Sequence, residues 1–223
     1  MEWLNETFAG FDGGVFRAMH SLAEAAGGFL TPLTKLVTFI GEKGIVYFLA
    51  AIVLMLFPKT RRAGVCVFGA VGLGAILTSL TLKGIVGRER PFLANETFRA
   101  FWEFVGSPHE DGYCFPSGHV TSVTAAATAL FIFFNKKWSG AGFFAVLLMA
   151  FSRVYLIAHY ATDTLAGMLV GALSCAVAWG ITKGIFRLLE KYPENKFCAF
   201  CLTFDVRALF RRAPKTPENG ENE

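Results

Sequence analysis

The sequence predicts an all-α protein: an integral-membrane helical bundle of about five transmembrane helices, preceded by helices that lie in the membrane interface. Two observations support this fold class. Of the 223 residues, 54% are hydrophobic and 17% are charged, whereas soluble domains are about 45–50% apolar and about 25% charged. The apolar residues also gather in runs that approach the length a bilayer requires, about 20 residues.

Five apolar stretches are predicted to cross the membrane. They cover residues 44–57, 64–86, 118–134, 141–158 and 164–188. The first is short when it starts at Gly44, and it can extend back toward Val37.

Residues 1–43 carry a different pattern. Phe16 and Met19 follow a helical period, but Arg17 and Glu24 interrupt the apolar run. This mixture is typical of amphipathic helices that lie in the interface rather than cross the bilayer.

No linker rich in Pro, Ser or Gly divides the apolar runs, so the chain is expected to form one folded unit. It consists of an N-terminal amphipathic segment (1–43), a transmembrane domain (44–190) and a cytoplasmic tail (191–223). The tail turns polar and is predicted to be partly disordered. A short interfacial helix is expected within residues 197–210.

Basic residues in short loops predict the orientation. Three loop regions that fall on one side of a five-span bundle carry Lys59, Arg61, Arg62, Lys136, Lys137, Lys183, Arg187 and Lys191. The positive-inside rule makes that side cytoplasmic. The C-terminus is then cytoplasmic, and loop 88–116 is extracytoplasmic, on a plasma or inner membrane. The formal net charge of +4 is too small to indicate nucleic acid as a partner.

The first of three polar clusters ends the second predicted span. Lys83, Arg88 and Arg90 precede Pro91. A single Lys at the end of a span is often an anchor whose ammonium group reaches the membrane–water interface. Three cations together suit an anion such as phosphate.

The second cluster, Cys114-Phe-Pro-Ser-Gly-His119, opens the third predicted span. Ser117 can cap the helix, which is an ordinary structural role. A helix N-terminus also offers free N–H groups to an anion, and His119 sits beside it.

The third cluster is Ser152-Arg153 followed by His159 and Asp163. His159 and Asp163 are four residues apart, so on a helix they would share one face. A carboxylate beside an imidazole fixes its tautomer and stabilises its charged form. Taken alone, such a pair is more often structural than catalytic.

In order, the clusters read Lys83-x6-Arg90-Pro91, Pro116-Ser117-Gly118-His119 and Ser152-Arg153-x5-His159-x3-Asp163. This pattern resembles the three-part signature of the type 2 phosphatidic acid phosphatase superfamily of membrane lipid phosphatases. The resemblance covers residues 83–163 directly. Many membrane members have six spans, whereas this sequence predicts five.

The resemblance implies a role for each matched position. His159 matches the nucleophile that forms a phosphohistidine, Asp163 matches its orienting carboxylate, and His119 matches the general acid and base. The remaining matches bind phosphate: the cations Lys83, Arg90 and Arg153, and the donors Ser117 and Gly118.

Neither a metal nor a cofactor is predicted. The sequence has no cluster of carboxylates of the kind that holds a metal pair. Cys198-x-x-Cys201 lacks a second cysteine pair, so it is weak evidence for zinc.

The predicted function is hydrolysis of a lipid phosphate monoester or pyrophosphate, with undecaprenyl pyrophosphate favoured because the chain is compact and its site faces outward. Phosphatidylglycerophosphate, phosphatidic acid and lipid A phosphate are alternative substrates.

A non-catalytic lipid-phosphate binder is an alternative function, but it would have no need of both His119 and His159. A lipid phosphotransferase would use the same residues. Vanadium haloperoxidases share similar motifs but are soluble. Membrane lipids are the expected surroundings, and the oligomeric state is not predicted.

Overall fold

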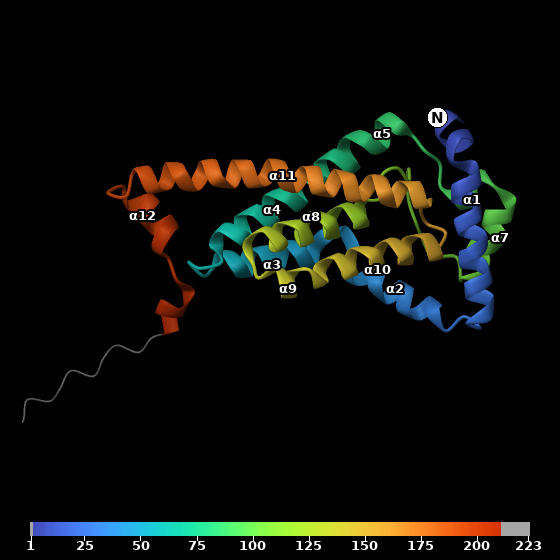
Figure 1. Cartoon of the computed structure of the whole chain (residues 1–223), viewed down its shortest axis with the longest axis horizontal. Coiled ribbons are helices and arrows are strands. Elements are labelled where there is room, and N and C mark those ends of the chain that lie inside the picture. Colours follow the sequence, from blue (N-terminus) through green and yellow to red (C-terminus); the bar gives the residue numbers. More distant parts are fainter. Residues whose placement is uncertain (1, 211–223) are drawn as a thin grey trace, which may run out of the picture.

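The computed structural model describes residues 2–210 of the chain, and all regular structure within that range is helical. The predicted all-α fold class is therefore confirmed. Five helices lie side by side in an elongated bundle (Figure 1). These are α3 (Ile45–Met55), α4 (Arg61–Ala75), α8 (Gly118–Phe133), α10 (Ala141–Tyr155) and α11 (Ala161–Lys191). The longest, α11, packs on α8 and α4, while α3 packs on α4 and α10 on α8.

The second predicted span is one helical segment with a change of hydrogen bonding inside it. After α4 the chain continues as a π-helix, η2 (Ile76–Leu82), and then as α5 (Lys83–Val86). Gly87 ends it with a left-handed backbone (φ 58°) that glycine adopts without a steric cost. Short π-helical segments are found most often at functional sites, and this one leads directly into the first polar cluster.

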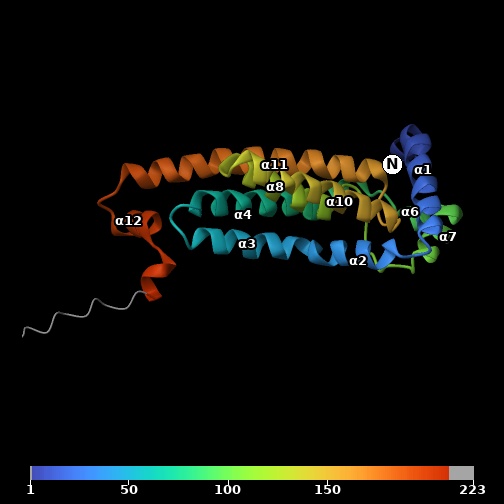
Figure 2. The same ribbon diagram turned by 60° about the horizontal axis from the view of Figure 1, so that its bottom comes forward.

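The N-terminal segment forms two helices that run in different directions. Figures 1 and 2 show α1 (Glu2–Ala25) lying across one end of the bundle, where it packs on α10 and α11. After a turn at Gly27 and Gly28, both with positive φ, α2 (Leu30–Ile40) runs beside α10. A 3-10 turn, η1 (Glu42–Gly44), joins it to α3.

Within the described part of the chain, three segments are long and apolar enough to cross a membrane: Arg61–Ala94, Lys136–Tyr155 and Ala161–Lys191. A fourth is counted when α2 and α3, which are bent by 47° relative to each other, form one broken span. Helix α8 is apolar but shorter. The structure therefore supports three to four long apolar helices, and the predicted count of five is not confirmed.

The connections carry the remaining short helices. At the end of the bundle near α1 lie α6 (Pro91–Ala94) and α7 (Glu96–Phe104). Helix α9 (Lys136–Ser139) joins α8 to α10, while α12 (Lys196–Thr203) and η3 (Val206–Phe210) follow the far end of α11 (Figure 1).

The predicted helix within residues 197–210 is thus divided into α12 and η3. The segment is held to the bundle by Arg61, whose Nη1 donates to the carbonyl of Cys201 at 2.9 Å. The predicted disorder of the tail falls largely on residues 211–223, which lie outside the described residues.

Helices α8 and α11 approach closely because α11 carries glycine where they cross. A Cβ at Gly167 would lie 2.7 Å from the carbonyl oxygen of Ser117, and a Cβ at Gly171 would lie 2.5 Å from that of Thr121. The Gly-x-x-x-Gly spacing is the small-residue pattern that lets membrane helices approach each other. Here it brings the N-terminal halves of the two helices together.

We expect Gly171→Ala to lower the thermal unfolding midpoint of the detergent-purified protein. The added methyl group meets backbone atoms that cannot rotate away, and overpacking of this kind costs typically about 1–3 kcal/mol. Gly180→Ala is the matched control, because a Cβ at this position of the same helix meets nothing within 4 Å. Equal midpoints for the two variants would contradict the close packing.

Candidate active site

The three polar clusters of the sequence meet at the end of the bundle that α1 covers. They line a cavity of about 290 Å³. Its lining residues are Ala75, Thr78, Ser79, Lys83, Arg90, Glu110, Gly118, His119, Ser122 and His159. Five of the eight predicted site residues are in this set; the other three, Ser117, Arg153 and Asp163, are fully buried beside it.

His159 lies in the connection between α10 and α11, which is also where the predicted spans 141–158 and 164–188 leave it. His159 and Asp163 therefore do not share a helix, and their proximity has another cause. Helix α10 ends at Tyr155, and the chain reverses through Ile157, which has a φ of 55°. The N–H of Ala158 donates to the carbonyl of Arg153 at 3.1 Å. This is a Schellman-type helix end, at which glycine is usual. A β-branched residue is rare in this conformation, and the turn that follows aims His159 into the cavity.

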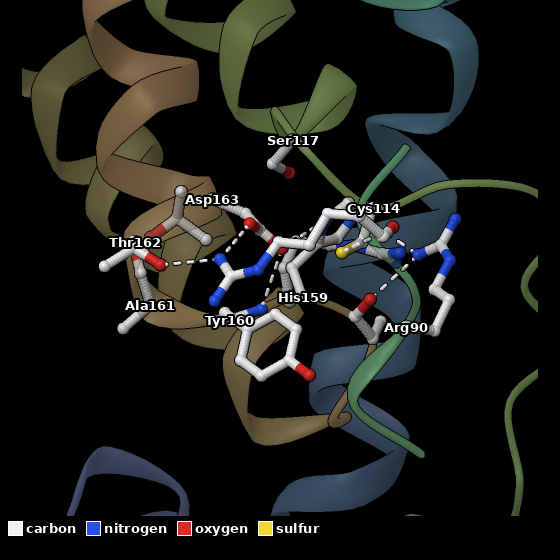
Figure 3. Close-up of polar contacts among 12 residues, drawn as sticks. Arg90, Cys114, Ser117, His159, Tyr160, Ala161, Thr162 and Asp163 are labelled. Carbon is white, nitrogen blue, oxygen red and sulfur yellow. Dashed lines mark hydrogen bonds and ion pairs between the residues drawn. The ribbon is translucent and has the colours of Figure 1, made fainter. Parts of the chain in front are cut away.

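The imidazole of His159 lies between a carboxylate and a guanidinium. Its Nδ1 is 3.5 Å from Oδ2 of Asp163, and its Nε2 is 3.4 Å from Nη1 of Arg90. Asp163 occupies the first turn of α11, where its Oδ2 also accepts a hydrogen bond from the N–H of Tyr160 at 3.0 Å. Figure 3 shows His159, Tyr160 and Asp163 gathered at this helix start. His159 and Asp163 are therefore brought together by the hydrogen bond that caps the start of α11.

The pKa of His159 lies well below its usual value. Burial is the largest cause, and the positive charges of Arg153, Arg90 and Lys83 act in the same direction. The ring is therefore neutral at physiological pH. A proton on Nδ1, facing Asp163, leaves a lone pair on Nε2, toward Arg90.

Arg90 and Arg153 are held in fixed positions at the cavity. Arg90 donates to the carbonyl oxygens of Ala158 at 2.8 Å and Asp111 at 2.7 Å. Arg153 is fully buried, and Lys83 is half-buried at the cavity wall. A cluster of three cations around one cavity suits an anionic group with several oxygens.

Glu110, from the loop before α8, bridges the two arginines. Its Oε2 lies 3.1 Å from Nη1 of Arg90, and its Oε1 accepts a hydrogen bond from Nη2 of Arg153. A carboxylate thus occupies the place between the guanidinium groups. Glu110 matches no motif in the sequence, and only the tertiary structure brings it to the two arginines.

The third cation of the first cluster, Arg88, does not line this cavity. It is buried on the other side of Asp163 and donates to Asp163 and Asp12. The prediction that Arg88 joins Lys83 and Arg90 around one anion is therefore wrong. Asp12, in α1, was not identified from the sequence, because a single acidic residue on an amphipathic helix usually faces water.

The start of α8 faces the cavity with several unused donors. Ser117 makes no side-chain cap of the helix, and its own N–H donates to the carbonyl of Asp163 at 3.1 Å. Among the described residues, no hydrogen-bond partner is found for Ser117 Oγ, His119 Nε2, Arg153 Nε or His159 Nδ1. Buried polar atoms are usually paired. His159 Nδ1 faces Asp163, but the other three unpaired atoms lie at or beside the cavity and indicate a site for a polar ligand.

The remaining histidines lie outside the cavity. His109 is 86% exposed and pairs with Asp111 at 3.1 Å, and His20 stacks on Phe101. Within residues 2–210 no three His, Cys, Asp or Glu side chains gather in a group that could hold a metal ion.

Comparison with known proteins identifies the family. The model of the family described as "PAP2 superfamily" matches residues 62–187. This range runs from α4 into α11 and contains all eight predicted site residues. The chain belongs to the PAP2 superfamily. The predicted resemblance is thereby confirmed, and no solved structure matches the chain.

Three similar relatives carry related names. An undecaprenyl-diphosphatase of Sulfolobus acidocaldarius is 27% identical, over 64% of this chain and 68% of the relative. The undecaprenyl-diphosphatase BcrC of Bacillus subtilis is 28% identical, over 71% and 78%. A putative undecaprenyl-diphosphatase, YbjG, of Escherichia coli is 30% identical, over 71% and 77%.

The bridge between the arginines generates a prediction for anion binding. Glu110→Gln keeps the shape of the side chain and removes its charge. We expect inorganic phosphate to inhibit this variant at a roughly tenfold lower concentration, a gain of about 1.4 kcal/mol. Asp111→Asn is the control: it removes the charge of the neighbouring residue, whose carboxylate is 85% exposed. Weaker inhibition of Glu110→Gln would mean that the carboxylate is needed to position the arginines.

The lowered pKa of His159 generates a prediction for stability. An unfolded histidine titrates near about 6.5, so below that pH the unfolded state binds a proton that buried His159 does not. Stability therefore falls as the pH drops below about 6.5. We expect His159→Asn to flatten this dependence, measured as the unfolding midpoint in detergent against pH. His109→Asn should keep the wild-type slope, and an unchanged slope for His159→Asn would contradict the argument.

Proposed function

We propose that this PAP2 protein removes a phosphate from undecaprenyl pyrophosphate at the extracytoplasmic face of the membrane. Its class, a phosphatase that acts on lipid phosphates, follows from the superfamily and from relatives that are named as lipid phosphatases. The observation that carries the mechanism is the position of His159, buried between Asp163 and Arg90 at the wall of a cavity lined by cations. The relatives named as undecaprenyl-diphosphatases support the choice of substrate.

In the proposed first step, Nε2 of His159 attacks the terminal phosphorus. The N–P bond forms as the bond from phosphorus to the bridging oxygen breaks, and His119 gives a proton to that oxygen. Arg90, Arg153 and Lys83 balance the charge on the phosphoryl oxygens, which is the main requirement of phosphoryl transfer. The lipid monophosphate then leaves.

In the second step, water attacks the phosphohistidine. His119 accepts a proton from the water, the N–P bond breaks, and inorganic phosphate is released. Asp163 acts throughout on Nδ1 of His159, where it stabilises the positive charge that forms on the ring. Ser117 and Gly118, at the start of α8, supply further donors to the phosphoryl group.

The proposed topology has five spans, one from each bundle helix, with α2 extending the first. Basic residues lie in segments away from the cavity: Lys136 is in α9, which joins α8 to α10, and Lys183 and Lys191 are in the last part of α11. The positive-inside rule makes their side of the membrane cytoplasmic. A lipid headgroup in the outer leaflet would then lie at the depth of His159.

We expect the detergent-purified protein to release phosphate in the presence of excess EDTA. The substrate panel is undecaprenyl pyrophosphate, phosphatidylglycerophosphate, phosphatidic acid and lipid A. His159→Ala and His119→Ala should each lower the rate by at least about 10²-fold, because a histidine acid or base contributes about 10²–10⁴. Asp163→Asn should cost less than His159→Ala, since it removes a charge and leaves the nucleophile.

His109→Ala is the control for these variants and should retain the wild-type rate. The preferred lipid identifies the substrate. A folded wild type that releases phosphate from none of the lipids would overturn the hydrolase and favour a lipid-phosphate binder or a phosphotransferase.

A further inference from the structure

A buried network joins α1 to the carboxylate behind His159. Asp12 is 2% exposed, and its Oδ2 accepts hydrogen bonds from Nη2 of Arg88 at 2.9 Å and from the hydroxyl of Thr162 at 2.7 Å. Its Oδ1 accepts from the N–H of Thr162 at 3.0 Å. Both carboxylate oxygens are therefore used, and they connect α1 to the first turn of α11.

Arg88 links the two carboxylates. Its Nη1 donates to Oδ1 of Asp163 at 2.6 Å and to the hydroxyl of Thr162 at 2.7 Å. Its Nε donates to Asn5 at 2.8 Å, and its guanidinium lies 3.7 Å from the centre of the Tyr160 ring. Figure 3 shows three of these partners, Thr162, Tyr160 and Asp163, close to one another. Held on all sides, Arg88 fixes one oxygen of Asp163 and leaves the other facing His159.

The charges of this network decide how strongly Asp163 acts on the imidazole. Asp163 and Arg88 alone form a neutral buried pair, so the positive charge of Arg88 would cancel most of the field at His159. Asp12 adds a second negative charge next to Arg88. The group behind the ring then carries a net charge of −1, which favours the positive imidazole formed when Nε2 bonds to phosphorus.

We propose that Asp12 is a positioning residue of the phosphatase reaction, which acts through Arg88 and Asp163 on the nucleophile His159. This inference rests on the proposed function. It gives α1 a part in the reaction, although none of its residues lines the cavity.

The test compares Asp12→Asn with wild type in phosphate release from undecaprenyl pyrophosphate, using the full-length protein in detergent with EDTA. We expect kcat to fall about tenfold or more, corresponding to a barrier change of at least about 1.4 kcal/mol. KM and the inhibition constant of inorganic phosphate should stay near wild type, because the cations that bind the phosphoryl group are unchanged. Glu6→Gln is the matched control: it makes the same chemical change at an exposed position of α1.

A double-mutant cycle separates this role from a structural one. In an Asp163→Asn background, Asp12→Asn should lower kcat by less than about twofold, because residues that act through one another are not additive. An equal loss in both backgrounds, or a loss of phosphate affinity in step with kcat, would overturn the inference. So would a wild-type kcat for Asp12→Asn.

If Asp12→Asn does not fold, Asp12→Ser replaces it. This variant removes the same negative charge and leaves a hydroxyl oxygen that can accept a hydrogen bond beside Arg88. A lower kcat with unchanged phosphate inhibition supports the inference, and a wild-type kcat overturns it. An inactive wild type in the same assay would instead contradict the proposed function.

Discussion

The close approach of α8 and α11 is the constraint on which the site depends. Because Gly167 and Gly171 carry no side chain, backbone atoms of the two helices come within contact distance. The N–H of Ser117 then reaches the carbonyl of Asp163 at 3.1 Å. The helix start that offers donors to an anion and the carboxylate behind the nucleophile are thereby held in one closely packed corner, which resists deformation.

Within that corner, the imidazole of His159 lies between positively charged groups on one side and a negatively charged group on the other. Arg90, Arg153 and Lys83 lie toward the cavity, and the net negative group of Asp163, Arg88 and Asp12 lies behind. In the resting protein, burial and the nearby cations together keep the ring neutral and therefore nucleophilic. Once Nε2 bonds to phosphorus, the phosphoryl oxygens offset the cations, and the negative group stabilises the charge on the ring. One arrangement thus serves both states of the nucleophile.

The helical class and the residues of the three polar clusters could be predicted from the sequence, because each motif is local and lies near the end of a predicted span. Prediction from the sequence failed where the fold depends on distant or unusual contacts. The turn at Ile157 has no glycine to signal it, so the fourth span was predicted to run to residue 158, whereas α10 ends at Tyr155. Glu110 and Asp12 are single acidic residues in segments that look solvated, and only tertiary contacts show that one bridges two arginines and the other is buried.

The position of α1 shows that a segment of interfacial composition also contributes a residue to the buried network. Arg17 and Glu24 make the segment look interfacial, and the helix does lie across the end of the bundle. Its inner face nevertheless carries Asp12, which needs a buried cation to offset the cost of losing water. Arg88 meets that need and is itself fixed in the process, so the same contact that anchors the helix also orients Asp163.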